Sequence, residues 1–470
     1  MLLSKLLEDI KVLNSYEDRE ITDVTDKTGN VKDGCAFVCI TGARFDGHSV
    51  AEDMLKNGAG AVIVTRDLGL KEQIIVENTR EAYALMCKNL FGRSADKLKI
   101  IGITGTNGKT TTAFVIKDIL KELGVQSGLI GTVKNMVGDK DFHTELTTPD
   151  PYDMHALFKM MVDEGIEYCV METSSQAFHQ MRLAGIHFVV GAFTNLTQDH
   201  LDYHGTLDEY KKCKKNLFIN CDKAIFNNDD EASDFMREGI EAPAAAYSIN
   251  EKSDYKAENV TLFSDSVEYD LNGQRVVFHI PGGFSVYNSL TAISVVNNLG
   301  FDLEKVINAA YYAKSVSGRV EVLKTNTDFS VIIDYAHSPD GLEKAINAVR
   351  GFTKGRVITL FGCGGDRDKT KRPKMGKIAT ELSDIVVVTS DNPRTEDPEE
   401  IIKDILEGID IENKEIITIV DRSEAIKKAI SIAQKDDAIL LAGKGHETYQ
   451  VIGKERVHYD EREVVADILR

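Results

Sequence analysis

The feature that most constrains this chain is a glycine-rich loop placed between a strand and a helix. The apolar run 99–105 predicts a buried strand, and the amphipathic stretch 111–124, which closes on Gly124, predicts a helix. The string GTNGKTT (105–111) joins them. Glycines let backbone N–H groups turn toward an anion, and a helix N-terminus adds positive potential. The order strand, loop, helix therefore predicts a phosphate-binding loop.

Two side chains of this loop suit nucleotide chemistry. Lys109 would reach the β- and γ-phosphates of ATP, and Thr110 would offer its hydroxyl to Mg²⁺. The general pattern places a further glycine where this chain has Ile103, so a turn without a ligand is the alternative. The residues expected to contact ATP are Gly105, Thr106, Asn107, Gly108, Lys109, Thr110 and Thr111.

Strands and helices alternate along most of the sequence, which predicts an α/β protein with parallel sheets covered on both faces. A length of 470 residues suggests three domains, at roughly 100–200 residues each. We expect an N-terminal α/β domain (1–98), a central P-loop ATPase-type domain with a mostly parallel sheet (99–318) and a C-terminal Rossmann-like doubly wound domain (319–470).

The expected elements follow from apolar runs and their flanking glycines. The N-terminal MLLSKLLEDI predicts an amphipathic helix, and the stretch around Asn272-Gly273 predicts a β-hairpin. Further strands are expected at 35–40, 59–65, 167–173, 187–195, 329–336, 356–362, 384–391, 415–421 and 437–443, and further helices at 51–58, 153–165 and 285–300.

Composition narrows the function classes. The formal net charge of -19 disfavours nucleic-acid binding, because an acidic surface repels phosphate backbones. The seven cysteines are odd in number and contain no CxxC, which favours a reducing compartment. No apolar run reaches the roughly 20 residues of a membrane span. We therefore expect a cytoplasmic protein that binds neither nucleic acid nor membrane. A monomer is expected as well, although nothing in the sequence reveals the oligomeric state.

Three strings together resemble one family. TGTNGKTTT (104–112), METSSQ (171–176) and TNLTQDHLDYHG (194–205) are similar to segments of the Mur ligases and of their relative folylpolyglutamate synthase. The resemblance spans nearly the whole chain. It implies a three-domain ligase that uses ATP and Mg²⁺ to join an amino acid to a carboxylate through an acyl-phosphate.

A metal site is expected beside the phosphate loop. Glu172 ends a predicted strand, where a carboxylate suits Mg²⁺, although a lone strand-end glutamate is usually a surface residue. The resemblance implies that His200 binds the metal and that Lys214 carries a carbamate formed from CO₂. Neighbouring lysines favour a neutral amine, although a solvated basic helix face is the plainer interpretation. The expected metal ligands are Thr110, Glu172, His200 and the Lys214 carbamate.

Further nucleotide contacts are implied by the same resemblance. Asn288 matches an asparagine of the family that lies near the nucleotide. Arg319 matches a residue that contacts phosphate, and Asp334 matches a residue that helps to hold the nucleotide. His337 follows in the same loop. A helix N-terminal Asn, a surface Arg and a strand-end Asp are the structural alternatives. The expected catalytic residues are Lys109, Glu172, His200, Lys214, Arg319 and Asp334.

The carboxylate substrate implied by the resemblance is a UDP-N-acetylmuramoyl dipeptide. The family's D-S-R element reads Lys27-Thr28-Gly29 here, Leu146 replaces a common Asn and Gln176 a frequent His, which leaves the fine detail of these contacts open. The positions that match precursor contacts are Thr28, Ala43, Arg44, Phe45, Thr147, Thr148, Ser174, Gln180 and Arg182.

The amino acid implied by the C-terminal motifs is meso-2,6-diaminopimelate. Arg394 suits its distal carboxylate, because a guanidinium binds carboxylates as a fork. L-Lysine lacks that group and would leave Arg394 unpaired. The matching positions are Arg367, Asp391, Asn392, Pro393, Arg394, Gly443 and Glu447. Three alternatives stay open: the same reaction with L-lysine, a folylpolyglutamate synthase, and a nucleotide-dependent switch that performs no ligation.

Overall fold

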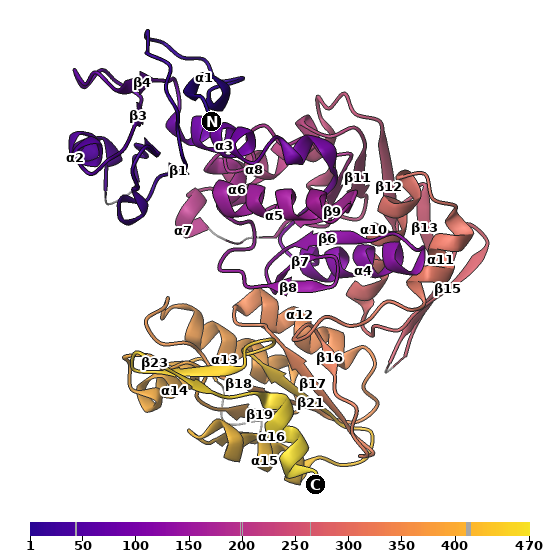
Figure 1. Ribbon diagram of the computed structural model, residues 1–470. Helices are drawn as coiled ribbons and strands as arrows, with labels where there is room; N and C mark the ends of the chain where they lie inside the picture. The colour runs from indigo at the N-terminus through magenta and orange to yellow at the C-terminus, as the bar shows by residue number, and fades with distance from the viewer. Residues whose placement is uncertain (43–44, 198, 200, 264, 410–414) are drawn as a thin grey trace. The chain divides into compact units, whose positions relative to one another are not determined.

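The computed structural model describes residues 1–42, 45–197, 199, 201–263, 265–409 and 415–470 (Figure 1). The chain groups into two compact units, 1–256 with 290–309 and 257–289 with 310–470. The predicted domain limits at 98 and 318 stay a prediction. Within the described ranges, we find no helix with both the length and the apolar character needed to cross a bilayer.

The first unit opens with a small parallel sheet. Its strands lie in the order β1 (Val24–Thr25), β2 (Ala36–Val38), β3 (Ala61–Val64) and β4 (Gln73–Ile75). Side chains from β2 and β3 alternate between two buried clusters, one toward α1 (Leu3–Leu6) and α3 (Thr79–Leu90), the other toward α2 (Ala51–Lys56). The strands predicted at 35–40 and 59–65 and the helix at 51–58 are confirmed. Short 3-10 helices occur at Thr28–Asn30, Gly47–Val50 and Ser94–Lys97.

The N-terminal helix is shorter than expected. A helix over 1–10 was predicted, but α1 covers only Leu3–Leu6. Asp9 adopts a left-handed backbone with φ +65°, which ends regular helix. The Asn89 side-chain amide donates to the carbonyls of Leu6 (3.1 Å) and Glu8 (2.8 Å), so a tertiary contact satisfies groups that a longer helix would have used.

The larger sheet of the first unit is mostly parallel. Its parallel strands lie in the order β12 (Ala244–Ser248), β11 (Ala224–Asn227), β10 (Val190–Phe193), β5 (Lys99–Thr104), β9 (Tyr168–Glu172) and β6 (Ser127–Ile130). Beside β6, β7 (Asn135–Val137) and β8 (Lys140–Phe142) form an antiparallel extension that the sequence analysis did not anticipate. The main helices are α4 (Lys109–Glu122), α5 (Pro151–Asp163), α6 (Ser175–His179), α7 (Leu201–His204), α8 (Leu207–Ile219), α9 (Ser233–Arg237) and α11 (Leu303–Ala310).

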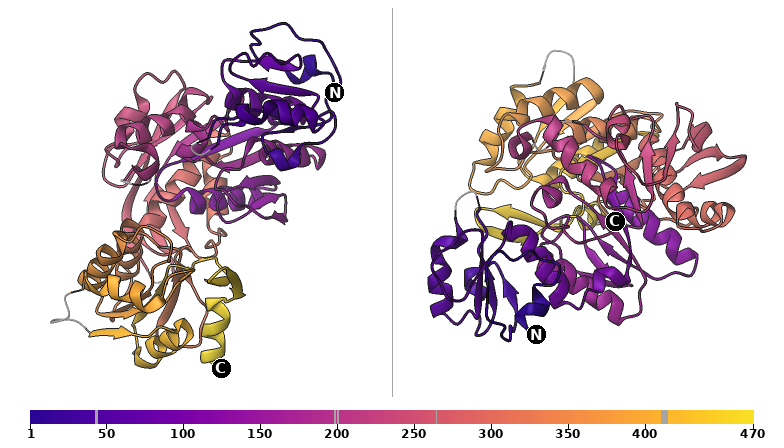
Figure 2. Two further views of the ribbon diagram at one scale, coloured as in Figure 1. Left: turned by 90° about the vertical axis from the view of Figure 1, so that its left-hand side faces the viewer. Right: turned by 90° about the horizontal axis from the view of Figure 1, so that it is seen from above.

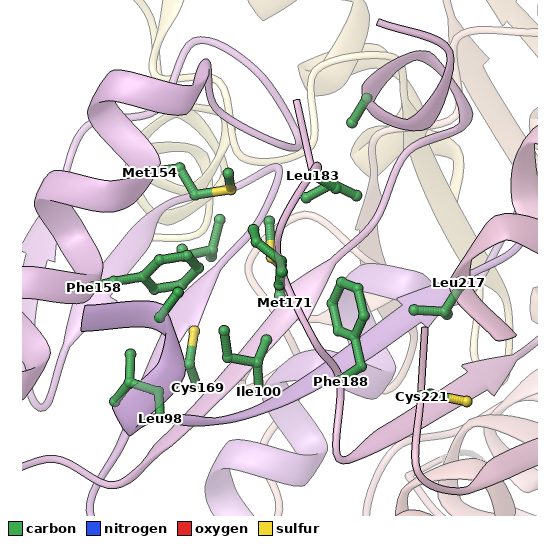
Figure 3. Packing of buried hydrophobic residues seen from close by; sticks show 14 of the residues in the cluster. Leu98, Ile100, Met154, Phe158, Cys169, Met171, Leu183, Phe188, Leu217 and Cys221 are labelled. Carbon is green, nitrogen blue, oxygen red and sulfur yellow. The ribbon is translucent and has the colours of Figure 1, made fainter. Parts of the chain in front are cut away.

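One face of this sheet packs on α5 and α8. Figure 3 shows Ile100 of β5 and Cys169 and Met171 of β9 beside Phe158 of α5, with Leu217 of α8 in the same cluster. All five side chains are buried. This apolar layer fixes the carboxyl ends of β5 and β9, from which the phosphate loop and Glu172 project.

The second unit contains a β-hairpin and a doubly wound sheet. Strand β13 (Tyr255–Leu262) starts beside β12 and leads into β14 (Val267–Leu271) and β15 (Gln274–Phe278). The turn at Asn272 and Gly273 has φ of 49° and 78°, the type I′ geometry that an Asn-Gly pair favours. Helix α10 (Gly283–Asn298) follows, so both the hairpin and the helix predicted here are confirmed.

The C-terminal sheet is covered on both faces, as its continuous apolar strands predict (Figure 2). One buried cluster joins it to α12 (Pro339–Arg350), α13 (Lys371–Leu382) and α14 (Pro398–Leu406), and the other to α15 (Arg422–Ile432) and α16 (Glu461–Ile468). The strand order is β16 (Glu321–Val322), β17 (Ser330–Asp334), β21 (Ala438–Ala442), β18 (Val357–Phe361), β19 (Ile385–Val388) and β20 (Glu415–Thr418), with only β16 antiparallel. A separate hairpin pairs β22 (Tyr449–Ile452) with β23 (Glu455–His458).

Candidate functional site

The phosphate loop leaves β5 and enters α4 as the sequence predicts. Gly105 and Gly108 have φ of 149° and 85°, which L side chains rarely adopt. A Cβ on Gly105 would lie 1.9 Å from the Thr194 hydroxyl oxygen, so the loop needs glycine for space as well as for conformation. The backbone N–H of Thr106 donates to the carbonyl of Asn195 at 2.8 Å, which anchors the loop to the chain after β10. The loop is therefore fixed in place by its contacts with the chain after β10.

Two lysines converge on one carbonyl of this loop. Lys109 donates to the carbonyls of Gly105 at 2.8 Å and Thr106 at 3.0 Å. Lys214, from α8, donates to the same Gly105 oxygen at 2.8 Å. Its side chain is buried, and its ammonium lies 4.4 Å from the centre of the Tyr210 ring. Burial, with the Lys109 charge adding to it, holds the pKa of the Lys214 amine well below its usual value.

Glu172 lies at the end of β9 and faces the start of α4. It is buried and accepts a hydrogen bond from the Thr110 hydroxyl at 2.9 Å. The Thr132 hydroxyl donates to the same carboxylate oxygen at 3.0 Å, and the Thr132 N–H donates to the other oxygen at 2.9 Å. A carboxylate flanked by two hydroxyls is the hard oxygen set that Mg²⁺ prefers, so these residues fit that ion.

Thr132 was missed by the sequence analysis. It follows β6, a short strand that was not predicted, and its only sequence signal is the Gly131-Thr132 pair after an apolar run. A Cβ on Gly131 would lie 2.3 Å from a Glu172 carboxylate oxygen, so that glycine makes room for the carboxylate. His200, Ala43 and Arg44 lie outside the described residues. Among the described residues, no group of three or more His, Cys, Asp or Glu side chains could hold a metal ion.

The predicted precursor contacts of the central segment lie around the loop after residue 146. The Thr148 hydroxyl donates to the carbonyl of Glu172 at 2.9 Å, and the Ser174 hydroxyl oxygen lies 3.1 Å from it. Arg182 donates to the Thr148 carbonyl at 2.7 Å and to the Gln180 side chain at 3.0 Å. The structure thus brings four of these residues together beside Glu172.

Thr147, the fifth predicted precursor contact of this segment, links these residues to the side chains around the Glu172 carboxylate. The Thr147 hydroxyl lies 3.0 Å from the Thr132 hydroxyl, which itself contacts Glu172. In the N-terminal sheet region, Thr28 lies in an exposed 3-10 turn and Phe45 is 52% exposed. The turn adjoins a cavity of about 360 Å³ whose lining includes Asp26 and Asp150.

In the second unit, Asp334 organises the start of the C-terminal sheet. Its carboxylate oxygens accept from the backbone N–H groups of Val320 and Ala336, each at 2.8 Å. Burial raises the pKa of this carboxyl, and the nearby Arg319 charge works against the rise. The Arg319 guanidinium lies 5.2 Å from the centre of the Tyr335 ring. Asn288 is buried in α10. Asp334 is thus the last residue of β17, and its carboxylate binds the backbone of the neighbouring segments.

The predicted diaminopimelate contacts lie in three segments, 362–376, 390–398 and 442–450, which meet at the carboxyl ends of β18, β19 and β21. Arg394 donates to the Gly365 carbonyl at 2.8 Å, and its own backbone has a left-handed φ of 52°. Asn392 donates to Glu447 at 2.9 Å. The Gly443 N–H donates to the carbonyl of Asp334 at 3.0 Å. Residues from different loops, 29 positions apart for Gly365 and Arg394 and 55 apart for Asn392 and Glu447, therefore form one cluster.

Individual members of this cluster differ in exposure. Asp391 and Asn392 are buried, while Arg367 is exposed and donates to the Asp366 carbonyl at 3.1 Å. Burial raises the pKa of Glu447, which is the direction expected for a carboxyl group close to Asp391. Lys444 lies beneath these residues and was not singled out from the sequence.

Comparison with known proteins defines the class to which this fold and site belong. The model of the Mur ligase middle domain matches residues 103–296, and that of the Mur ligase glutamate ligase domain matches residues 318–445. The chain belongs to the Mur ligase family.

Within that family, the relatives point to one reaction. A UDP-N-acetylmuramoyl-L-alanyl-D-glutamate–2,6-diaminopimelate ligase from Clostridium perfringens is 45% identical, over 100% of this chain and 99% of its own length. The ligase of the same name from Clostridioides difficile is 41% identical over the same shares. A solved structure of a ligase of that name gives a TM-score of 0.72 at 31% identity and covers 96% of this chain and 94% of that chain.

A more distant structure marks the limits of the fold comparison. Folylpolyglutamate synthase from Mycobacterium tuberculosis gives a TM-score of 0.61 at 18% identity, over 78% of this chain and 92% of that chain. Identity this low supports a shared fold alone. The fold therefore leaves the choice of substrate to the site and to the full-length relatives.

Proposed function

We propose that this chain is an ATP-dependent ligase that adds meso-2,6-diaminopimelate to the D-glutamate carboxylate of UDP-N-acetylmuramoyl-L-alanyl-D-glutamate. The observation that carries the proposal is the cluster of Arg367, Arg394, Asp391 and Glu447 in a chain 45% identical, end to end, to a ligase named for that step. Two guanidinium groups suit a carboxylate, and two carboxylates suit an ammonium. Diaminopimelate carries both groups at its far end.

The reaction needs no protein nucleophile. A carboxylate oxygen of the precursor attacks the γ-phosphorus of ATP, ADP leaves, and an acyl-phosphate forms. The amine of the amino acid then attacks the acyl carbon, and the tetrahedral adduct releases phosphate to leave an amide. Positioning and charge neutralisation carry most of such a phosphoryl transfer. The chain's part is therefore to hold the phosphates and to exclude water.

The phosphate loop is suited to the first of these tasks. Its backbone N–H groups and the N-terminus of α4 would bind the phosphates, and Lys109 would move from its loop carbonyls onto the γ-phosphate. Thr110, Glu172 and His200, with a carbamate on Lys214, would hold Mg²⁺, which when bound supplies positive charge to the phosphate oxygens. The buried, easily deprotonated amine of Lys214 supports the carbamate.

The precursor and the nucleotide would use the remaining sites. Thr147, Thr148, Ser174, Gln180 and Arg182 would bind the muramoyl dipeptide, with Thr28 and the segment 43–45 toward its uridine. Asn288, Arg319 and Asp334 would complete the nucleotide site. We place the enzyme in the cytoplasm, as a monomer that binds neither nucleic acid nor membrane; the charge of -19 supports the exclusion of polyanions.

An amino-acid panel tests the proposal. Purified protein is given ATP, Mg²⁺ and the UDP-muramoyl dipeptide, and both phosphate release and product mass are measured. We expect an amide with diaminopimelate and a kcat/KM for L-lysine lower by about a hundredfold or more, because lysine leaves the half-buried guanidinium of Arg394 without its carboxylate partner.

The alternatives give different results in the same assay. A preference for lysine would overturn the amino-acid assignment and keep the ligase. Glutamate addition to a folate, without activity on the muramoyl dipeptide, would indicate a folylpolyglutamate synthase. ATP binding with no amide product under any combination would indicate a nucleotide-dependent switch.

A further inference from the structure

Lys444 is a buried cation beneath the C-terminal cluster. It follows β21 between Gly443 and Gly445, and its side chain has 0% exposure. Its ammonium donates to the side-chain oxygen of Asn392 at 3.1 Å and to the carbonyl of Tyr449 at 2.9 Å. A lysine carries three N–H donors, and two are therefore used by these contacts.

The third side of the ammonium faces two carboxylates. Asp391 lies 3.4 Å away and Glu447 lies 3.7 Å away. The Asp391 oxygen nearest the lysine is buried and has no hydrogen-bond partner in the described part of the chain. A buried carboxylate needs a nearby opposite charge, and Lys444 supplies it for a pair of acidic groups that would otherwise repel each other.

Lys444 also sets the orientation of an amide. The Asn392 oxygen accepts from Lys444 and, at 2.9 Å, from the backbone N–H of Val451. With its oxygen held on that side, Asn392 points its NH₂ group at Glu447, to which it donates at 2.9 Å. An inverted amide would place its NH₂ against the ammonium, which has no acceptor to offer.

We propose that Lys444 is a positioning residue for amino-acid specificity: it orients the amide of Asn392 and holds the carboxylates of Asp391 and Glu447 in place as acceptors for the ammonium of the incoming amino acid. The inference rests on the proposed function. Lys444 acts through its neighbours, because its complete burial and its contacts leave no face for a substrate. The lysine thus places one positive charge beside two adjacent carboxylates, at the place where the positive end of the substrate would bind.

Variants that remove or keep the positive charge of residue 444 distinguish a positioning role from a purely structural one. Lys444→Gln keeps donors for Asn392 and removes the cation, whereas Lys444→Arg keeps the cation. We expect Lys444→Gln to raise the KM for diaminopimelate at least about tenfold, the scale of a lost charged hydrogen bond. The kcat at saturation and the KM for ATP should stay within about twofold. Lys444→Arg should recover most of the affinity.

A double-mutant cycle shows whether Lys444 acts through Glu447. Glu447→Gln alone should also raise the KM, and the double variant should raise it by clearly less than the product of the two single effects. Lys454→Gln serves as the control, because Lys454 is an exposed lysine at the tip of the neighbouring hairpin. It should leave every constant unchanged.

The outcomes are distinct. An unchanged KM of Lys444→Gln for diaminopimelate overturns the inference. This includes the case in which the melting temperature and kcat fall while that KM stays the same, because this pattern means that Lys444 only supports the fold. If Lys444→Gln does not fold, the double variant Lys444→Met/Asp391→Asn replaces it, because it removes one charge of each sign. The inference then requires that the KM of this double variant for diaminopimelate be higher than that of Asp391→Asn alone. Failure of the unaltered protein to use diaminopimelate would instead count against the proposed function.

Discussion

At the scale of single residues, the most informative side chain is Lys214. The sequence shows it among Lys211, Lys212 and Lys215, a pattern typical of a solvated helix face. The structure buries Lys214 alone among these and aims its amine at the carbonyl of Gly105 in the phosphate loop. A buried neutral amine is the form that adds CO₂, so its environment suits a carbamate better than a permanent ammonium.

We therefore expect turnover to depend on CO₂. Removal of dissolved CO₂ should lower activity, bicarbonate should restore it, and ¹³C-bicarbonate should give a carbamate carbonyl signal that Lys214→Ala lacks. Lys214→Ala should lose at least about a hundredfold in kcat, as expected for a group that stabilises transition-state charge. Because only the free amine reacts, the carbamate signal should weaken as the pH falls.

The matched control for this experiment is Lys212→Ala. Lys212 lies on the same helix but is exposed, and it pairs with Glu209 at 2.8 Å. Its replacement should leave turnover and the ¹³C signal intact. Near-normal activity of a folded Lys214→Ala variant would remove the role proposed for Lys214.

Motif residues could be predicted from the sequence, but the residues that support them could not. Lys109, Thr110 and Glu172 occur in strings with a recognisable order, and the structure gathers them at the ends of β5 and β9. Thr132 and Lys444 have no comparable signal. Their contacts depend on how separate loops meet, as when Lys444 reaches Asn392 across 52 positions.

At the scale of elements, the loops after β18 and β19 are interlocked through glycine. A Cβ on Gly365 would lie 1.9 Å from the carbonyl oxygen of Pro393, inside the motif that carries Arg394. The buried guanidinium of Arg372 donates to both oxygens of Glu396 at 3.0 Å and fixes the two loops further. The position of Arg394 is therefore set by backbone contact between neighbouring loops.

Gly365→Ala should push these loops apart and displace Arg394. We expect kcat/KM for diaminopimelate to fall roughly tenfold to a hundredfold, because misplacement by about 1 Å is costly at a reaction site. The KM for ATP should change little. Gly283→Ala is the control, since the nearest heavy atom to its added Cβ, in Leu262, is 4.0 Å away. Equal effects of the two variants on kcat/KM would mean that close packing of the loops is unimportant.

Long periodic elements could be predicted and short edge elements could not. The buried strands of the C-terminal sheet read as continuous apolar runs, which is why β17, β18, β19 and β21 match the prediction. Strands β7, β8, β22 and β23 contain three or four residues each and lie in hairpins. The pairing of these four strands depends on their neighbours. Because several of their residues are polar, their sequences show little hydrophobic pattern to detect.

At the scale of the whole molecule, stability depends on a buried histidine in α5. His155 has no exposed surface, and neither ring nitrogen has a hydrogen-bond partner among the described residues. Burial, with the Lys88 charge adding to it, lowers its pKa to about 3, and Asp96 opposes this only weakly. The imidazole must therefore be neutral in the folded protein, and protonation favours unfolding.

The sign and size of the pH effect follow from this shift. Below the unfolded pKa of 6.5, the unfolded chain binds a proton that the folded chain refuses, so stability falls as pH falls until about pH 3. Between pH 6.5 and about pH 5, this one group should remove about 2 kcal/mol from the free energy of unfolding. His155→Leu removes the titration and fills the same apolar site, so the variant should lose less stability over that range.

Urea unfolding followed by circular dichroism measures the difference, because other titrating groups cancel between the two proteins. His187→Gln serves as the control for replacement of a histidine at an exposed position, since 61% of the His187 side chain is exposed. Identical pH slopes for His155→Leu and the unaltered protein would mean that water or a rearranged partner reaches the imidazole. A shallower slope for the His155→Leu variant alone would show that one buried neutral ring on α5 makes the fold less stable in acid.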